Sequence, residues 1–294
     1  MQSVPADVLP RLGFPDGLSH DEAGLREFYR AWCLNVPFDN MRKFIAHALG
    51  GSDPLPGTDS QDFLENWLDH GTGGTCWPSS NALYETAKAA GFEVSRCSAS
   101  MWDTGEATHG TVIATVEGRD YAVDSSILTV RPVPLEKDAV YVERGPLNPV
   151  EVEWTEGTFM FWFEAPNMPV VWPCRLLERG VAHAFYAERY EWSRTNGPFN
   201  EKLYVRRNFP DRCVVISGNR KWERTPHGQT EELLGADALV AELIERHGYS
   251  QGIVGQWIDA GGLEKALTPS EGSRALPELD RLPPSRRPTG SRED

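Results

Sequence analysis

The chain of 294 residues contains few cysteines and no long uncharged hydrophobic segment. Five cysteines are an odd and sparse set for this length, which argues against a disulfide framework and favours a reducing compartment. No window approaches the roughly 20 apolar residues that a membrane-spanning helix needs. The N-terminal residues also lack the basic stretch and apolar run of a signal peptide. We therefore expect a cytoplasmic protein with no membrane partner.

Positive charge is also scarce. Lys and Arg number 29 against 43 Asp and Glu, which gives a net charge of −14 and argues against a nucleic-acid partner. Hydrophobic residues, at 40%, and ten tryptophans are in contrast sufficient for a large core, which excludes a disordered, collagenous or coiled-coil protein. We expect no metal site, because Cys97, Cys174 and Cys213 show no metal-ligand spacing with histidine.

The first 91 residues show the hydrophobic period of a helical bundle. Apolar residues recur at helical spacing over 19–35, and Ser19 with Glu22 fits the capping box that starts a helix. A shorter helix is predicted over 60–70. After a glycine-rich turn, a third helix is predicted over about 76–90, where a glycine stops it.

From residue 92 the hydrophobic period changes to two, which is typical of strands. The dipeptide Glu117-Gly118 is predicted to be the turn of a hairpin. Short strands at this spacing favour an antiparallel sheet or barrel, so we expect residues 92–195 to form a β-barrel. The predicted strands cover residues 92–96, 111–116, 119–123, 139–142, 150–154 and 159–163.

Residues 196–268 are predicted to form an α/β lid, with strands near 203–205 and 213–217 and a helix over 236–247. Residues 269–294 contain five prolines and no aromatic residue, a composition typical of a disordered tail. The predicted fold class is therefore α+β, with an N-terminal helical bundle, a central antiparallel β-barrel and a C-terminal α/β lid.

Cys76 is the first candidate for a nucleophile. It follows Gly73-Gly74 at the predicted start of a helix, where unpaired N–H groups and the helix dipole favour a thiolate over a thiol. The thiolate is the reactive form of cysteine, and the glycines let the backbone approach a substrate closely. Cysteine is more often a small buried hydrophobe, so this motif alone leaves both interpretations open.

A cysteine nucleophile needs a base, and the base needs a group that orients it. Among seven histidines, His109 differs because it opens a predicted strand. A two-residue turn in this hairpin places Asp124 opposite Thr111, which makes His109 and Asp124 diagonal neighbours on one face. The aspartate would then fix the tautomer of the imidazole. A solvated aspartate and a structural histidine are the alternative.

Four motifs in this order resemble the arylamine N-acetyltransferase family. Val36-Pro37-Phe38-Asp39-Asn40 is similar to the family's Val-Pro-Phe-Glu-Asn, and Thr72-Gly73-Gly74-Thr75-Cys76 is similar to its Arg-Gly-Gly-x-Cys. Thr108-His109 matches the strand that opens with the catalytic histidine, and Asp124 follows where the family has Leu-Val-Asp. The likeness covers about residues 8–250, and we interpret the chain as a divergent member.

The resemblance implies a cysteine-dependent N-acyltransferase with a catalytic triad of Cys76, His109 and Asp124. The Cys76 thiolate would take an acyl group from a thioester donor, with His109 as general base. A small-molecule amine acceptor would then attack the acyl-cysteine, and backbone N–H groups near Cys76 would stabilise the oxyanion. The implied co-substrate is acetyl-CoA or another acyl-CoA. The residues expected to contact this donor are Gly74, Thr108 and Gly110.

Two departures from the family pattern affect this interpretation. The family's arginine before Gly-Gly is Thr72 here and its glutamate is Asp39, so the ion pair that the resemblance implies beside the nucleophile cannot form. The family's Gly-Phe-Gly after the aspartate is replaced within Ser125-Ser126-Ile127-Leu128. Because the resemblance places that segment in the acceptor pocket, we expect simple arylamines to be poor acceptors compared with more polar or larger amines.

The residues leave other functions open. One is an amide synthase of a biosynthetic pathway, which would take its acyl chain from an acyl carrier protein. Others are a transglutaminase-like cysteine hydrolase, because the same triad can serve water or amide substrates, and a binding module that has lost catalysis. Residues 196–268 are called the third region below. Its basic residues are interpreted as a solvated face or as a docking patch for the phosphates of an acyl carrier. They are Arg206, Arg207, Arg212, Arg220, Lys221 and Arg224.

Overall fold

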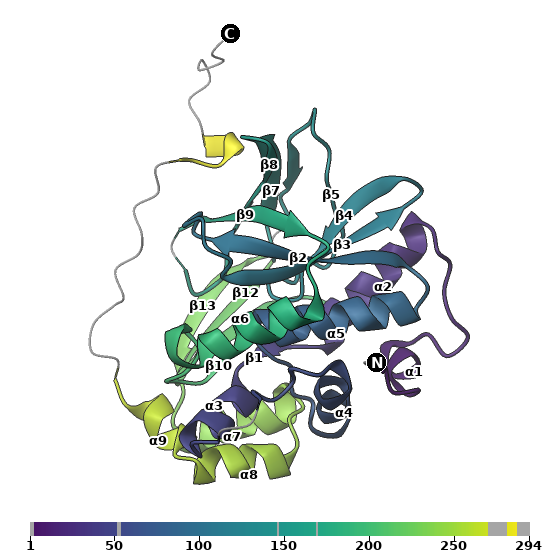
Figure 1. Cartoon of the computed structure of the whole chain (residues 1–294). Helices are drawn as coiled ribbons and strands as arrows, with labels where there is room; N and C mark the ends of the chain where they lie inside the picture. The colour runs from purple at the N-terminus through teal and green to yellow at the C-terminus, as the bar shows by residue number, and fades with distance from the viewer. Residues whose placement is uncertain (1–2, 52–53, 146, 169, 270–280, 287–294) are drawn as a thin grey trace.

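Helices form the N-terminal part of the chain. The computed structural model describes residues 3–51, 54–145, 147–168, 170–269 and 281–286. Within that part of the chain, five helices precede the long strands (Figure 1). They are α1 (Val8–Leu12), α2 (Glu22–Asn35), α3 (Met41–Ala48), α4 (Ser60–His70) and α5 (Cys76–Ala89). The three predicted helices are therefore confirmed, whereas the sequence pattern does not indicate the short helices α1 and α3.

The start of α2 differs from the prediction. Its N-cap is Asp21, whose carboxylate accepts a hydrogen bond from the Gly24 amide at 2.8 Å. Ser19 instead donates to Asp21 Oδ1 at 2.7 Å. The predicted capping box of Ser19 and Glu22 is thus wrong. The charged carboxylate of Asp21 lies directly before the helix and interacts more strongly with its positive end than a hydroxyl two residues earlier.

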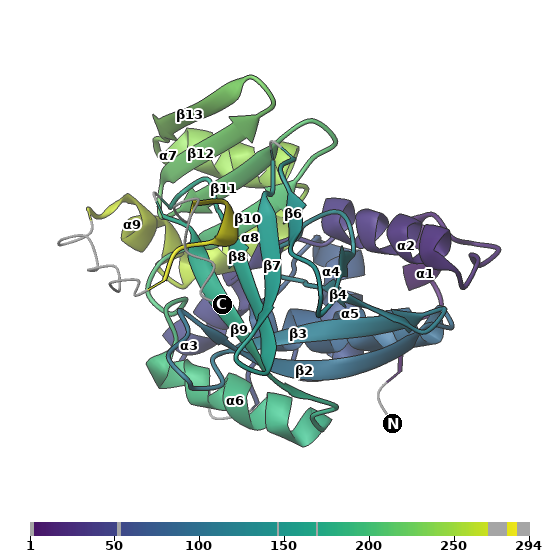
Figure 2. The ribbon, with the colours of Figure 1, turned by 90° about the horizontal axis from the view of Figure 1, so that it is seen from above.

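Eight strands form one antiparallel sheet, which curls into a nearly closed barrel (Figure 2). The strand order is β5-β4-β3-β2-β9-β8-β7-β6, and side chains from most of these strands meet at one small interior cavity, as in a barrel. The predicted antiparallel barrel is confirmed. The strands are β2 (Glu93–Met101), β3 (His109–Val116), β4 (Arg119–Val123), β5 (Val133–Pro134), β6 (Tyr141–Glu143), β7 (Val150–Thr155), β8 (Thr158–Phe163) and β9 (Trp172–Arg179).

The hairpin between β3 and β4 has the predicted two-residue turn. Val116 pairs with Arg119, and the ladder runs back to Val112 opposite Val123. Both turn residues have positive φ, 51° at Glu117 and 75° at Gly118. This conformation matches the twist of the flanking strands and fixes their register. The register in turn decides which residues lie opposite each other at the far end of the hairpin.

Helix α5 lies between the N-terminal helices and the barrel. It packs against α4 on one side and against β2 and β3 on the other, and α6 (His183–Asn196) covers a further side. The first residue of α5 therefore lies where the helices meet the mouth of the hairpin. No helix in the described part of the chain is long and apolar enough to span a membrane.

A second sheet of five antiparallel strands joins the N-terminal helical region to the third region, residues 196–268. Its order is β1-β10-β11-β12-β13, so the short strand β1 (Phe38–Asp39) from the N-terminal region pairs with a strand of the third region. The third-region strands are β10 (Tyr204–Asn208), β11 (Cys213–Ser217), β12 (Arg220–Thr225) and β13 (Gly228–Leu233). The helices that pack with them are α7 (Ala236–Ala241), which continues as a π-helix over Glu242–Arg246, α8 (Gln251–Asp259) and α9 (Gly262–Leu267).

The basic residues of the third region do not form one solvated face. Arg206 and Lys221 are only 3% and 7% exposed, so that interpretation is wrong for both. Arg206 donates to Asn148 Oδ1 at 2.6 Å, and Lys221 Nζ lies 3.0 Å from Glu242 Oε2. The others use their charge within the protein as well: Arg207 donates to the His247 carbonyl, and Arg212, Arg220 and Arg224 pair with Glu223, Glu231 and Glu164.

The C-terminal segment is described only in part. Residues 270–280 and 287–294, most of the expected disordered tail, lie outside the described residues. Residues 281–286, in contrast, lie against the barrel, where the Ser285 amide donates to Glu151 of β7 at 2.9 Å. Arg286 also pairs with Glu164 at 2.7 Å. These six residues therefore have polar contacts that their composition did not indicate.

Replacing Glu242 by glutamine is expected to lower the free energy of unfolding by about 3 kcal/mol, because the buried Lys221 ammonium would lose its closest anionic partner. The matched control is Glu231→Gln, which affects the exposed pair with Arg220 and should cost less than about 1 kcal/mol. Urea denaturation measures both values. Equal small losses for the two variants would contradict the role of burial.

Candidate active site

Cys76 is the first residue of α5, as predicted, and it carries a free thiol. Its Sγ lies 3.8 Å from the carbonyl oxygen of Thr108. The other four cysteines of the chain are buried, whereas Cys76 is partly accessible. The preceding Thr75 does not cap the helix with its side chain, so the first N–H groups of α5 stay available to a ligand or an oxyanion.

The glycines before Cys76 are required by close packing. A Cβ atom on Gly73 would lie 1.8 Å from the Pro37 carbonyl oxygen, and one on Gly74 would lie 2.8 Å from the Phe63 ring. Neither position can accept a side chain without moving its neighbours. The same loop is held from the other side, because the Asp39 amide donates to the Gly74 carbonyl at 3.2 Å. This packing fixes the backbone that leads into Cys76.

The other two residues expected to contact the donor lie on either side of His109. Thr108 Oγ1 accepts a hydrogen bond from the Met101 amide at 3.0 Å, which ties the start of β3 to β2. A Cβ atom on Gly110 would lie 2.8 Å from the Trp77 ring. Both residues therefore have structural reasons for their identity. The expectation that Gly74, Thr108 and Gly110 bind the donor stays a prediction.

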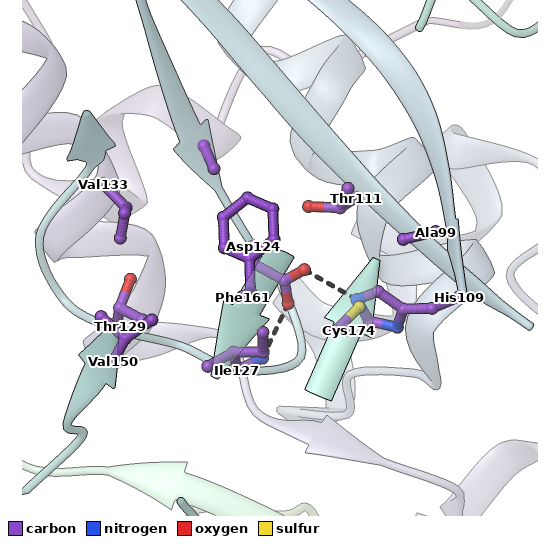
Figure 3. Close-up of a pocket in the computed structure, with 11 residues that line it drawn as sticks. Ala99, His109, Thr111, Asp124, Ile127, Thr129, Val133, Val150, Phe161 and Cys174 are labelled. Carbon is purple, nitrogen blue, oxygen red and sulfur yellow. Dashed lines mark hydrogen bonds and ion pairs between the residues drawn. The ribbon is translucent and has the colours of Figure 1, made fainter. Parts of the chain in front are cut away.

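His109 and Asp124 form a direct contact within the barrel (Figure 3). His109 Nε2 lies 2.7 Å from Asp124 Oδ2, and the two residues are only 2% and 7% exposed. The second carboxylate oxygen, Oδ1, accepts hydrogen bonds from the amides of Ser126 and Ile127 at 2.8 and 2.7 Å. The hairpin register thus brings the two residues together as the sequence predicted, and Asp124 holds the imidazole by one nitrogen, leaving Nδ1 free of the carboxylate.

The charges of this pair support each other. Burial lowers the pKa of His109, but the charge of Asp124 and its hydrogen bond outweigh burial, and with the contact to Cys76 they raise the pKa to about 10. Burial raises the pKa of Asp124, yet the His109 charge and the two backbone N–H groups bring it below its usual value. At neutral pH the arrangement therefore favours an imidazolium next to an ionised carboxylate, with the Cys76 side chain in contact with the ring.

Tyr29 is a part of the site that the sequence did not reveal. Its hydroxyl donates to the Asp124 carbonyl at 2.8 Å and accepts from the amides of Asp124 and Thr129 at 3.0 and 3.3 Å. Tyr29 is fully buried in the apolar face of α2. In the sequence, Tyr29 resembles an ordinary aromatic residue of the core. The signal that could have identified it is its hydroxyl within an otherwise apolar stripe, because a buried hydroxyl needs a hydrogen-bond partner.

Lys43 is a second residue that the sequence analysis missed. It is 3% exposed, and its Nζ donates to the carbonyl and hydroxyl of Ser193 at 3.0 and 2.9 Å. Burial lowers the pKa of Lys43 to about 8, while the charge of an ionised Cys76 acts in the opposite direction. A lysine two residues into α3 appears in the sequence as an ordinary surface residue, so only its packing against α6 identifies it.

The cavity beside His109 and Asp124 is small and mostly apolar. Its volume is about 20 Å³, which is room for roughly one water molecule. Apart from Thr111 and Thr129, its walls beyond the two catalytic candidates are apolar side chains and one thiol. Those residues are Ala99, Ala122, Ile127, Val133, Val150, Phe161 and Cys174 (Figure 3). No group of His, Cys, Asp and Glu in the described part of the chain could hold a metal ion.

The segment after Asp124 is arranged differently from the expected polar pocket wall. Ser125 is 1% exposed and its hydroxyl lies 2.9 Å from Ser80 Oγ, so it is used within the protein. Leu128 belongs to the N-terminal core. Within the segment 125–128, the Ser126 hydroxyl is the side-chain group that is buried without a hydrogen-bond partner among the described residues. One of the two added hydroxyls is therefore already used within the protein and the other is not.

Solved structures of arylamine N-acetyltransferases share this fold. The enzyme from Mycobacterium smegmatis matches with a TM-score of 0.76 and 17% identity, over 90% of this chain and 100% of that one. That from Salmonella typhimurium matches with a TM-score of 0.70 and 17% identity, over 86% and 97%. The Mycobacterium marinum enzyme, in complex with CoA, matches with a TM-score of 0.70 and 17% identity, over 88% and 95%.

Sequence comparison alone finds less. No family model and no curated protein matches the chain. The fold is nevertheless that of the arylamine N-acetyltransferases, and the resemblance inferred from the four motifs is confirmed at the level of the fold.

Replacing Tyr29 by phenylalanine is expected to lower the free energy of unfolding by about 1–3 kcal/mol, because buried backbone groups of Asp124 and Thr129 would lose their partner. The ring would still fill its place in the core. Chemical denaturation measures the change. A loss below about 0.5 kcal/mol would show that water or another group satisfies these backbone atoms.

Proposed function

We propose that this protein is an acyltransferase that moves an acyl group, acetyl in the first instance, from a thioester donor through an acyl-cysteine at Cys76 to an amine. The observation that carries the proposal is the buried His109–Asp124 contact of 2.7 Å beside the one cysteine that is not buried. A nucleophile, a base and a group that orients the base are thus available together. The motif resemblance and the shared fold agree with this assignment.

In the first step, the proton of the Cys76 thiol resides on His109 and the thiolate attacks the thioester carbonyl. The raised pKa of His109 favours this ion pair. The N–H groups at the start of α5 stabilise the oxyanion that forms. When the carbon–sulfur bond of the donor breaks, His109 gives its proton to the departing thiolate, which leaves as a free thiol. The acyl group is then held on Cys76.

In the second step, the amine attacks the acyl-cysteine and His109, now neutral, accepts a proton from the amine nitrogen. The bond between the acyl carbon and Cys76 Sγ breaks, and the thiolate and imidazolium are restored. Asp124 stays ionised throughout, because its role is to orient His109 and to stabilise its positive charge. Two proton transfers through one imidazole therefore balance the whole reaction.

We further propose that the donor is an acyl-CoA. The support is the shared fold with an enzyme solved in complex with CoA. A donor carried on an acyl carrier protein and a hydrolytic reaction with water use the same acyl-cysteine. They differ in the thiol that is released and in the group that attacks second, so the products distinguish them.

Incubation with acetyl-CoA and no amine is expected to add one acetyl group to the protein, and Cys76→Ala is expected to add none. Intact-protein mass spectrometry with peptide mapping measures the adduct and locates it. Because the Cys76 thiol contributes little packing at the end of a helix, the variant should keep the melting temperature of the parent within a few degrees.

The matched control for the adduct is Cys174→Ala, which removes the thiol that lines the cavity beside His109. This variant should still be acetylated on Cys76. An adduct that survives Cys76→Ala, or that disappears in Cys174→Ala with the fold intact, would contradict the proposed nucleophile. Acetate release in the presence of an amine, with no acetylated amine formed, would instead favour a hydrolase.

Simple arylamines are expected to be poor acceptors. No aromatic side chain occurs in the segment 125–128 to stack on an aryl ring. The unpartnered Ser126 hydroxyl favours an amine with its own polar group. Steady-state kinetics with acetyl-CoA should therefore rank hydroxylated amines above aniline.

Ser126→Ala provides the control for acceptor preference. It should lower kcat/KM for the hydroxylated amine by about three- to tenfold, the equivalent of one hydrogen bond, and leave the value for aniline unchanged. The expectation fails if aniline is the best acceptor of the parent protein, with kcat/KM above ~10⁴ M⁻¹s⁻¹.

A further inference from the structure

A short segment of the third region packs directly on the loop that precedes Cys76. The amide of Ser250 donates to the His70 carbonyl at 3.0 Å, and the Ser250 hydroxyl lies 2.8 Å from His70 Nδ1. A Cβ atom on Gly71 would lie 2.5 Å from the Gly248 carbonyl oxygen. The two segments are almost 180 residues apart in sequence, yet here their backbones are in contact. The third region therefore helps to set the path of the nucleophile loop.

The strongest link between these segments is the Asp39 carboxylate. Its Oδ2 accepts hydrogen bonds from the Gly73 amide at 2.6 Å and from the Tyr249 hydroxyl at 2.9 Å. Its Oδ1 accepts from the Met41 amide at 2.9 Å. Asp39 and Tyr249 are 0% and 2% exposed. One buried carboxylate thus joins the third region, the start of α3 and the loop three residues before Cys76.

Asp39 makes this contact with neutral donors only. No ion pair of Asp39 occurs in the described part of the chain, and the nearby Arg42 pairs with Asp62 at 2.9 Å instead. Since the residue before Gly73 is Thr72, no guanidinium is available there either. A buried carboxylate without a cation depends on its hydrogen bonds to stay ionised. Among the described residues, the Tyr249 hydroxyl is the only side-chain group that donates a hydrogen bond to Asp39.

We propose that Tyr249 and Asp39 act together as positioning residues that hold the Gly73–Cys76 loop in the geometry needed for attack by the Cys76 sulfur. The inference rests on the proposed function, because it concerns the same nucleophile. It assigns the third region a part in orienting the nucleophile. The ionised form of Asp39 is the one that accepts both the Gly73 amide and the Tyr249 hydroxyl on the same oxygen.

The proposal predicts a dependence on pH. Burial raises the pKa of Asp39, and the hydrogen bonds from Gly73, Met41 and Tyr249 oppose that effect. Protonation of Asp39 weakens its hold on Gly73, so the loop loses its geometry as the pH falls through this raised pKa. The other titratable groups that act on Asp39 or feel its charge are Arg42 of α3, Arg207 of β10 and Tyr190 of α6.

The test is Tyr249→Phe, followed by the rate of Cys76 alkylation by iodoacetamide between pH 4 and pH 9 (about the range in which carboxyl groups and imidazoles titrate). Loss of the hydroxyl removes a hydrogen bond that lowers the pKa of Asp39. The decline of the alkylation rate at low pH should therefore begin about one pH unit higher than in the parent protein. Acetylation by acetyl-CoA at pH 7 should slow at least several-fold.

The matched control is Tyr121→Phe. Tyr121 is a buried tyrosine whose hydroxyl also donates to a carboxylate, Glu22 at 2.7 Å, on the far side of the hairpin. Its alkylation profile should match that of the parent. An equal shift in both variants would overturn the proposal, because a general loss of stability would then explain the change in alkylation. No shift in Tyr249→Phe would also overturn it, because the Tyr249 hydroxyl would then have no effect on the reactivity of Cys76.

Asp39→Asn is the second variant. An asparagine has one oxygen and one NH₂ group, so its NH₂ group must face either the Gly73 and Tyr249 donors or the Met41 amide. Alkylation of Cys76 should therefore be slow at every pH, and the change in rate due to the titration of Asp39 should vanish. A profile that keeps the low-pH step of the parent would contradict the role of Asp39. Alkylation needs no acyl donor, so this test can succeed or fail independently of whether an acyl-cysteine forms.

Discussion

The geometry of the candidate site depends on the buried contact between His109 and Asp124. A carboxylate and an imidazole that are almost fully enclosed stabilise each other's charge, because neither has water to do so. The surrounding structure holds the two residues in position. A two-residue turn sets the register of β3 and β4, the amides after Asp124 hold its second oxygen, and Tyr29 of α2 holds its backbone. Cys76, the nucleophile of the proposed reaction, comes from a different element, the start of α5, which packs against the same hairpin.

A second buried carboxylate, Asp39, solves the same physical problem in another way. Asp124 has a cationic partner, whereas Asp39 has two amides and one hydroxyl. Both carboxylates connect segments that are separate in the sequence, since Asp124 contacts His109 and Asp39 contacts Gly73 and Tyr249. The pairing of β1 with β10 places Asp39 at the seam between the N-terminal helices and the third region. Asp124 thus holds His109, and Asp39 holds the loop that precedes Cys76.

Structures that share 17% identity with this chain keep the same fold over nearly their whole length. Most of the sequence is therefore free to change, provided that the helical and strand periods persist and the core is filled. In the third region, Lys221 and Glu242 are buried as an ion pair. The number of basic residues in the sequence does not reveal that one of them is buried with an acidic partner. The neutral donors to Asp39 include one from elsewhere in the fold, the Tyr249 hydroxyl.

The sequence by itself determined the features that depend on near neighbours. The helices α2, α4 and α5, the hairpin and the meeting of His109 with Asp124 follow from hydrophobic period and turn chemistry, which act over a few residues. Tertiary structure alone decided the roles of Tyr29, Lys43 and Tyr249, whose partners lie 95, 150 and 210 residues away. It also decided that α6 forms, since its buried Tyr186, Tyr190 and Ser193 make only a weakly apolar face. The sequence shows which hydrogen bonds a polar side chain can form but not which partner it has, because the packing of the helices and strands determines that partner.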